Sequence, residues 1–174
     1  FPFVHMATAD PEYNVKVAKK AGFASFDPGQ DLHRYSAEQL YSIISRISLL
    51  FANQHEVEGM CRMMDIPRTE LIGMVPMAVF TQGAEGSMLY FEGKEEHIPA
   101  IPVRMVDPTG AGDAYRAGFL TAYAKGLPPL NCCRVGTVTA SYVVEVEGCQ
   151  TNLADWEMMK SRYENYFGHL APNE

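Results

Sequence analysis

The sequence predicts an α/β protein in which a mostly parallel β-sheet carries helices on both faces. Two observations lead to this fold class. Short apolar runs with strand character alternate with longer segments of helical periodicity, and such alternation implies right-handed βαβ crossovers between parallel strands. A glycine turn between two later runs predicts a β-hairpin on the C-terminal side of these strands. We expect residues 1–174 to form a single α/β domain with a sizeable core.

Four strands are expected in the first half of the chain, each within a short apolar run: 3–6, 23–26, 49–52 and 74–81. Helices are expected between them, at 10–20, after Ser36 and at about 55–64. Asp10-Pro11 favours a helix start and Gly22 a helix stop. Ser36 is expected to be an N-cap with Gln39 as its capping-box partner, because apolar side chains follow with helical spacing.

The second half begins with glycine turns. Gly83 and Gly86 frame a turn into a strand at 87–91, and Gly93-Lys94 turns the chain toward a second strand at 97–98. Three helices are then expected, at 114–125, 130–145 and 156–167, and Gly148 is expected to break the second one.

Composition limits the classes of function. The net charge is −7 and the chain has no basic block, so nucleic acid and anionic membranes are not expected partners. No run of about 18 uninterrupted apolar residues occurs, so no transmembrane helix is expected. The four cysteines form no Cys-x-x-Cys pair, which favours free thiols and a cytoplasmic location. Adjacent Cys132 and Cys133 are expected to be buried.

The most informative segment is Asp-Pro-Thr-Gly-Ala-Gly-Asp at 107–113. It follows a short apolar run and opens into a helical pattern. A glycine turn that enters a helix leaves N–H groups free at the positive end of the helix dipole, which suits an anion. Asp113 would add a proton acceptor beside a held phosphate, as phosphoryl transfer to a hydroxyl requires. The alternative is an ordinary strand-to-helix turn with capping residues alone.

The whole string closely resembles the Asp-Thr-x-Gly-Ala-Gly-Asp signature of the ribokinase or PfkB-type carbohydrate kinase family, and residues 114–119 resemble its prokaryotic nucleoside-kinase-like branch. The resemblance implies a ribokinase-like three-layer α/β/α fold, with ATP and Mg²⁺ as cofactors. It also implies phosphoryl transfer to a hydroxyl of a sugar or nucleoside. Asp113 would be the base, and the N–H groups of Gly110, Ala111 and Gly112 would stabilise the transferring phosphoryl group. Family members are longer, so their N-terminal part and β lid are expected to be absent from this chain.

Two further segments resemble nucleotide-binding motifs of the family. Asn53 and Glu56 match an Asn-x-x-Glu motif whose Glu is associated with hydrated Mg²⁺ and whose Asn is associated with the nucleotide phosphates. The alternative is a capping box on the next helix. Thr81, Gly83 and Gly86 match a Thr-x-Gly-x-x-Gly turn at which ATP phosphates and ribose pack. The alternative there is a glycine-rich β-turn, and both interpretations need the glycines' conformational freedom.

The segment 145–150, with Gly148, is expected from the resemblance to close over adenine and to help bind a monovalent cation such as K⁺. Asp107 and the carbonyl of Thr109 would be the remaining cation ligands. The alternative is that Gly148 is a helix C-cap.

Several candidate clusters follow predicted strands: Asp27, Asn53 with Glu56, Thr81 with Gly83, and the 107–113 segment. In parallel α/β sheets, ligands gather at the carboxyl ends of the strands, so one shared site is expected. Asp27 occupies a place that often reads Asp-x-Asn-x-Arg in the family, and Gly29 and Asp31 depart from that pattern.

Two hypotheses of different classes therefore remain. The first is the ATP-binding and catalytic part of a sugar or nucleoside kinase, with a small-molecule acceptor and a lean toward a nucleoside. The second is a truncated, non-catalytic nucleotide-binding or oligomerisation domain. Whether the chain forms a homodimer is left open.

Overall fold

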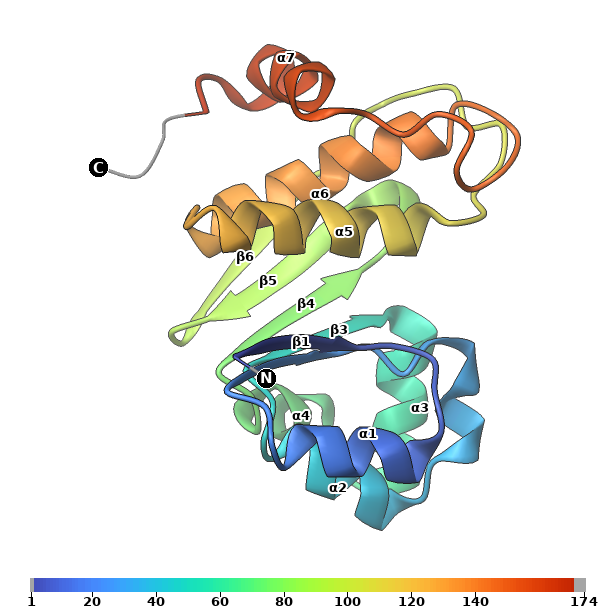
Figure 1. The fold of residues 1–174 in the computed structure, drawn as a ribbon, viewed down its shortest axis with the longest axis vertical. Helices are drawn as coiled ribbons and strands as arrows, with labels where there is room; N and C mark the ends of the chain where they lie inside the picture. Colours follow the sequence, from blue (N-terminus) through green and yellow to red (C-terminus); the bar gives the residue numbers. More distant parts are fainter. Residues whose placement is uncertain (1, 171–174) are drawn as a thin grey trace. The chain divides into compact units, whose positions relative to one another are not determined.

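The computed structural model describes residues 2–170, in which six strands form one sheet in the order β1-β2-β3-β4-β5-β6 (Figure 1). The strands are β1 (Phe3–Met6), β2 (Phe23–Phe26), β3 (Leu49–Asn53), β4 (Met77–Thr81), β5 (Ser87–Phe91) and β6 (Lys94–Ile98). Strands β1 to β4 pair in parallel. Glu92 and Gly93 between β5 and β6 both have positive φ, which is the geometry of a tight hairpin turn. The α/β class, the parallel pairing and the hairpin are confirmed.

Contacts divide the chain into two compact units. The first unit extends to Thr81 and includes Tyr90–Glu95. The second consists of Gln82–Leu89 and the chain from Glu96 onward. That residues 1–174 form a single domain stays a prediction.

The helices of the first unit cover one face of its parallel strands (Figure 1). They are α1 (Pro11–Ala18), α2 (Ala37–Ile44), α3 (Gln54–Met64), α4 (Arg68–Gly73) and the 3₁₀ helix η1 (Gly29–Arg34). The expected capping box at the start of α2 is present, because Ser36 accepts from the Gln39 N–H at 3.2 Å and the Gln39 side chain accepts from the Ser36 N–H at 2.9 Å.

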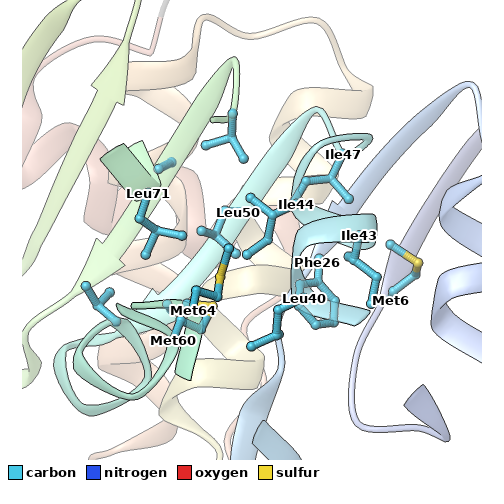
Figure 2. Close-up of a cluster of buried hydrophobic side chains, with 14 of the residues drawn as sticks. Met6, Phe26, Leu40, Ile43, Ile44, Ile47, Leu50, Met60, Met64 and Leu71 are labelled. Atoms are coloured by element: carbon cyan, nitrogen blue, oxygen red, sulfur yellow. The ribbon is translucent and has the colours of Figure 1, made fainter. Parts of the chain in front are cut away.

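The core of the first unit follows from alternation along the strands (Figure 2). Leu50 and Phe26 pack against Leu40 and Ile44 of α2, within a cluster that also takes in Met60 of α3. Leu49, Phe51 and Val79 alternate with these strand residues and are buried as well. Both faces of the central strands are therefore buried, as a parallel sheet requires.

Three elements of the first unit differ from the sequence-based expectation. The helix α4 and the 3₁₀ helix η1 are too short to leave a periodic pattern, so neither was expected. Strand β4 begins at Met77 instead of residue 74, because Met74 caps α4 and Pro76 lacks the N–H that a central strand donates.

The second unit contains α5 (Ala111–Ala124), α6 (Pro129–Val143) and α7 (Trp156–Phe167) (Figure 1). Helices α5 and α6 pack closely through glycines, since a Cβ at Gly136 would lie 2.8 Å from the carbonyl oxygen of Tyr115. The Tyr115 hydroxyl is buried and lies 2.8 Å from the Ser87 hydroxyl, which ties α5 to β5. Burial raises the pKa of the Tyr115 hydroxyl well above its ordinary value.

Cys132 and Cys133 of α6 are free and buried, as expected. Desolvation raises the pKa of each thiol to about 12, so both are protonated at neutral pH. Within residues 2–170, no helix combines the length and apolar character needed to cross a membrane.

Candidate active site

The segment before the signature is irregular and is not the strand that a strand-to-helix turn would need. Met105 and Val106 are 64% and 54% exposed. The N–H groups of Val106 and Asp107 donate to the Val144 carbonyl of the α6 C-cap, at 2.7 and 3.3 Å. These donors bind the end of a helix and do not join a strand ladder. The expectation that the signature loop follows a strand end is therefore wrong, whereas Asp27, Asn53 and Thr81 do stand at the ends of β2, β3 and β4.

The signature turn enters α5 through Gly110, which is the N-cap and has φ +81°. The Ala111 N–H donates to Pro108 and the Ala114 N–H to Gly110, at 3.2 and 2.9 Å. Within residues 2–170, no backbone carbonyl accepts a hydrogen bond from the N–H of Gly112 or of Asp113. Two donors at the positive end of the helix dipole thus remain for an anion.

Asp113 lies in the first turn of α5 with its side chain 81% exposed. Its carboxylate forms an ion pair with the guanidinium of Arg116, three residues further along the helix. The same guanidinium lies 3.5 Å from where a Cβ of Gly112 would be. Arg116 was not among the expected site residues, although its spacing from Asp113 is one at which helical side chains meet.

Asp107 connects the signature to the segment after α6. One carboxylate oxygen accepts from the Thr109 N–H at 2.9 Å, and the other accepts from the Gly148 N–H at 3.0 Å. Hydrogen bonds from the Thr109 side chain, then from the N–H groups of Gly148 and Thr109, hold the pKa of the Asp107 carboxyl below its ordinary value.

Gly148 is not a helix C-cap. Helix α6 ends at Val143 with Val144 as its cap, and Gly148 lies beyond it with φ +92°. The neighbouring Cys149 covers Gly110, because a Cβ on Gly110 would lie 2.4 Å from the Cys149 Cβ. The structure therefore brings Asp107, Thr109, Gly110 and Gly148 together.

Asn53 and Glu56 form the capping box of α3. The Glu56 N–H donates to the Asn53 side chain at 2.9 Å, and the Asn53 N–H donates to the Glu56 carboxylate at 2.8 Å. In the sheet register, Asn53 is the direct partner of Thr81 on β4. The capping interpretation is confirmed for this pair. The capping box uses one oxygen of the Glu56 carboxylate, and the second oxygen takes no part in it.

The turn after β4 is closed by a hydrogen bond of 2.8 Å from the Gln82 N–H to the Gly86 carbonyl. Gly83 and Gly86 have φ of +58° and +99°. A Cβ on Gly86 would lie 2.0 Å from the Ile98 carbonyl oxygen, so this position requires glycine. His97 further holds the turn through its contact of 2.7 Å with the Glu85 carbonyl oxygen.

Asp27 is buried, and one of its carboxylate oxygens accepts from the Gly29 N–H at 2.7 Å. Within residues 2–170, no group of three or more His, Cys, Asp and Glu side chains is arranged to hold a metal ion.

Comparisons with known proteins point to one family. The model of the pfkB family carbohydrate kinases matches residues 4–156. The nucleoside kinase of Methanocaldococcus jannaschii is 46% identical over 167 residues, which cover 94% of this chain and 55% of that protein. The nucleoside kinase of Methanothermobacter thermautotrophicus is 42% identical, over 97% of this chain and 56% of that protein.

Among solved structures, the M. jannaschii nucleoside kinase, described as an archaeal member of the ribokinase family, superposes with a TM-score of 0.89 at 45% identity. The superposition covers 94% of this chain and 56% of that one. The chain spans about half the length of the curated relatives it matches. Its fold is the ribokinase-like α/β fold, and the chain belongs to the pfkB family of carbohydrate kinases.

Proposed function

We propose that this chain is the ATP-binding and catalytic part of a kinase that transfers a phosphoryl group from ATP to a hydroxyl of a nucleoside or sugar. The observation that carries the proposal is the start of α5, where the unpaired N–H groups of Gly112 and Asp113 adjoin an exposed carboxylate in the same turn. Phosphate binding and proton acceptance, the two tasks of such a transfer, thus fall within one helical turn.

The phosphoryl group would be held by backbone donors. Gly110 directs the chain into α5 through its left-handed conformation, and the helix dipole adds partial positive charge at this end. As charge develops on the transferring group, the N–H groups around Gly112 would stabilise it without reorganisation. The sequence led us to expect the N–H groups of Gly110, Ala111 and Gly112 as donors. The Ala111 N–H already donates to the Pro108 carbonyl, so we propose that the Asp113 N–H takes its place as a phosphate donor.

Asp113 would accept the proton of the acceptor hydroxyl. That oxygen then forms a bond to the γ-phosphorus while the bond from phosphorus to the ADP oxygen breaks. Because the Asp113 carboxylate is paired with Arg116, the hydroxyl must displace the guanidinium or share the carboxylate with it. Arg116 also lies beside Gly112, so a displaced guanidinium would remain next to the phosphate.

Glu56 is the proposed contact of Mg²⁺ through water. Its carboxylate uses one oxygen in the capping box and retains the other for a water ligand. Bound Mg²⁺ would supply charge neutralisation between the phosphates of ATP. Asn53 at the end of β3 and its register partner Thr81 at the end of β4 are proposed contacts to the nucleotide. Gly83 and Gly86, in the turn after β4, are further proposed contacts.

For a monovalent cation such as K⁺, we propose the Asp107 carboxylate and the Thr109 carbonyl as ligands. The Asp107 carboxylate accepts hydrogen bonds from two N–H groups and from the Thr109 side chain, which leaves about one of its four lone-pair sites for a cation. Its pKa lies below the ordinary value, so the carboxyl is charged at neutral pH and would attract a cation.

A nucleoside is the proposed acceptor, because the named relatives are nucleoside kinases. The chain covers 55% and 56% of those proteins, so their acceptor is carried over to this chain as a proposal. A homodimer, the absence of nucleic-acid and membrane partners and a cytoplasmic location stay predictions.

The test is Asp113→Asn in the intact protein. We expect kcat to fall about 10²–10⁴-fold, because the hydroxyl loses its proton acceptor, while ATP affinity changes little. The matched control is Asp31→Asn, which breaks an Asp–Arg pair of the same i, i+3 spacing in η1. Near-normal turnover in Asp113→Asn removes Asp113 from the mechanism. ATP binding without transfer in the unmodified protein would favour the non-catalytic alternative.

A further inference from the structure

The segment 144–149, between α6 and α7, is bonded to the signature at two points. Its first carbonyl, that of Val144, accepts from the N–H groups of Val106 and Asp107. Near its other end, the Gly148 N–H donates to the Asp107 carboxylate at 3.0 Å. The position of Asp107, and with it the entry into the signature turn, therefore depends on how this segment is held.

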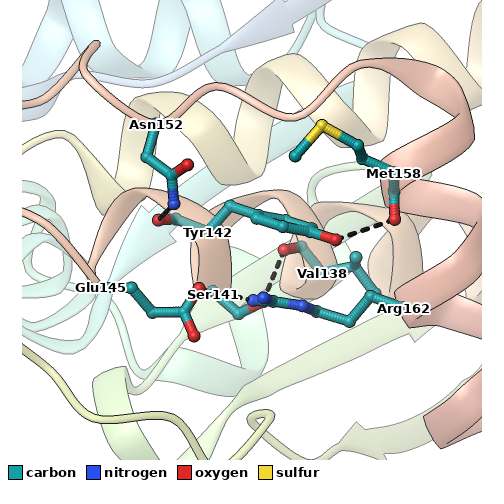
Figure 3. A network of polar contacts seen from close by, with 7 residues as sticks. All are labelled: Val138, Ser141, Tyr142, Glu145, Asn152, Met158 and Arg162. Atoms are coloured by element: carbon teal, nitrogen blue, oxygen red, sulfur yellow. Dashed lines mark hydrogen bonds and ion pairs between the residues drawn. The ribbon is translucent and has the colours of Figure 1, made fainter.

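Arg162 of α7 reaches back to the start of this segment (Figure 3). Its guanidinium donates to the Glu145 carboxylate at 2.9 Å and to the Ser141 hydroxyl at 3.0 Å. The guanidinium carbon lies 3.5 Å from the centre of the Tyr142 ring. One planar cation thus makes two hydrogen bonds and stacks on an aromatic ring, and the stacking of a planar guanidinium is the contact that Lys does not reproduce.

Tyr142 extends the same network to both sides of the segment (Figure 3). Its hydroxyl donates to the Met158 carbonyl at 2.9 Å, and its own carbonyl accepts from the Asn152 side chain at 2.7 Å. Asn152 and Met158, which follow the segment, are therefore both bonded to Tyr142, whose ring Arg162 covers.

The charged pair is partly shielded from water. The Arg162 and Glu145 side chains are 20% and 29% exposed. Salt and solvent screen such a pair less than a fully exposed one, so its geometry is held more firmly.

We propose that Arg162 is a positioning residue for the nucleotide site: it holds the 144–149 segment against Asp107 and thereby fixes the entry of the signature turn. The inference rests on the proposed function, since residues 145–150, which overlap this segment, are the ones expected from the resemblance to close over adenine. It gives α7 a role in substrate binding beyond covering α6.

The chain offers a matched control. Arg134 in the first half of α6 stacks on Phe167 at the end of α7, with its guanidinium carbon 5.5 Å from the ring centre. This contact also joins α6 to α7 through an arginine and an aromatic ring. It lies at the opposite ends of the two helices from the 144–149 segment. A general loosening of α7 would affect both arginine variants alike.

The experiment compares Arg162→Met, Arg162→Lys and Arg134→Met in the intact protein. Hydrogen exchange followed by mass spectrometry measures protection of the 144–149 amides without any nucleotide. Steady-state kinetics then give the KM for ATP, the KM for the acceptor and kcat. We expect Arg162→Met to speed exchange in this segment and to raise the KM for ATP about 10-fold, with a smaller change in kcat. Arg162→Lys should fall between it and the unmodified protein.

Arg134→Met should leave exchange at 144–149 and the KM for ATP within about twofold of the unmodified protein. Unchanged exchange in Arg162→Met overturns the inference, as does an equal change in both arginine variants. Faster exchange with an unchanged KM for ATP also overturns it, because the segment would then not act on the nucleotide site. If Arg162→Met does not fold, Arg162→Lys and Glu145→Gln test the proposal instead. The measurements are again hydrogen exchange at residues 144–149 and the KM for ATP.

Failure of the proposed function gives a different result. An unmodified intact protein that neither binds ATP nor transfers phosphate refutes the kinase proposal directly. The exchange arm still decides whether Arg162 holds the segment.

Discussion

Two glycines of the signature have different structural roles at the scale of single residues. Gly110 has φ +81°, and a Cβ there would lie 2.4 Å from the Cβ of Cys149. Gly112 lies inside α5 without a positive φ, and its nearest neighbour would be the Arg116 guanidinium at 3.5 Å, an ordinary contact. A side chain at Gly112 would therefore not force an unfavourable φ.

Alanine should separate these roles. Gly110→Ala should lower the melting temperature, because the left-handed conformation alone costs about 1–2 kcal/mol and the overlap with Cys149 adds to it. Gly112→Ala should keep or raise stability, since Ala is up to about 1 kcal/mol more favourable than Gly in a helix. It should nevertheless weaken transfer, because the added methyl group crowds the donors that would hold phosphate. Thermal unfolding and kcat/KM check both variants, and equal losses of stability would contradict this distinction.

Asp107 makes stability depend on pH. Its hydrogen bonds favour the charged form, so its pKa in the folded protein lies below the ordinary value of 3.8. The stabilisation is fully present above that ordinary value and is lost as pH falls through the lower folded pKa. Asp107→Asn should therefore lower the melting temperature by a constant amount between about pH 7 and pH 5, and the difference should shrink below about pH 4. A difference that does not change with pH would show that the charge contributes nothing.

At the scale of elements, the close approach of α5 and α6 depends on absent side chains. A Cβ on Gly136 would lie 2.8 Å from the Tyr115 backbone oxygen, and one on Gly118 would lie 2.4 Å from the Thr139 hydroxyl. Backbone cannot yield as a flexible side chain does, so the Gly136 contact is the stricter one. Tyr115 lies in α5, and α5 begins within the signature at Ala111. The packing of α5 on α6 therefore also fixes the position of the start of α5.

Gly136→Ala should destabilise the protein by about 1–3 kcal/mol, the usual cost of overpacking. The control is Gly73→Ala at the end of α4, where a Cβ would meet nothing within 4 Å. Denaturant unfolding of both variants provides the measurement. An unchanged unfolding midpoint in Gly136→Ala would mean that the two helices separate at little cost.

At the scale of the whole molecule, the chain matches 55% of the M. jannaschii nucleoside kinase. The proposed phosphate-binding turn and the proposed base are within it. We therefore expect the 174 residues by themselves to bind Mg·ATP weakly and to hydrolyse it slowly at most, because water reaches phosphates that the protein does not enclose. It should not phosphorylate ribose, fructose, adenosine or cytidine.

Calorimetry with ATP, followed by that acceptor panel, checks the expectation. The chain carrying Gly110→Ala serves as the control for binding at other places. Efficient transfer to any acceptor would show that the 174 residues suffice for catalysis, and no detectable ATP binding would argue against the kinase proposal itself.

The features predicted correctly from the sequence depend on residues close together in the chain. The Ser36–Gln39 capping box, the hairpin turn through Gly93 and the apolar strand β3 all arise from neighbours within a few positions. Local backbone conformation and side-chain periodicity specify such features, so sequence reasoning finds them. The seven signature residues are also contiguous, so the sequence alone was enough to indicate the family.

Tertiary structure alone decided which distant groups meet. The apolar run before the signature is irregular. At its end, the N–H groups of Val106 and Asp107 donate to the carbonyl of Val144, which caps the later helix α6. Gly148 proved to be a partner of Asp107 instead of a helix cap, and Gly110 proved to be covered by Cys149. Each of these contacts joins positions far apart in the chain. Their free energy exists only once the fold has formed, so no local pattern in the sequence records it.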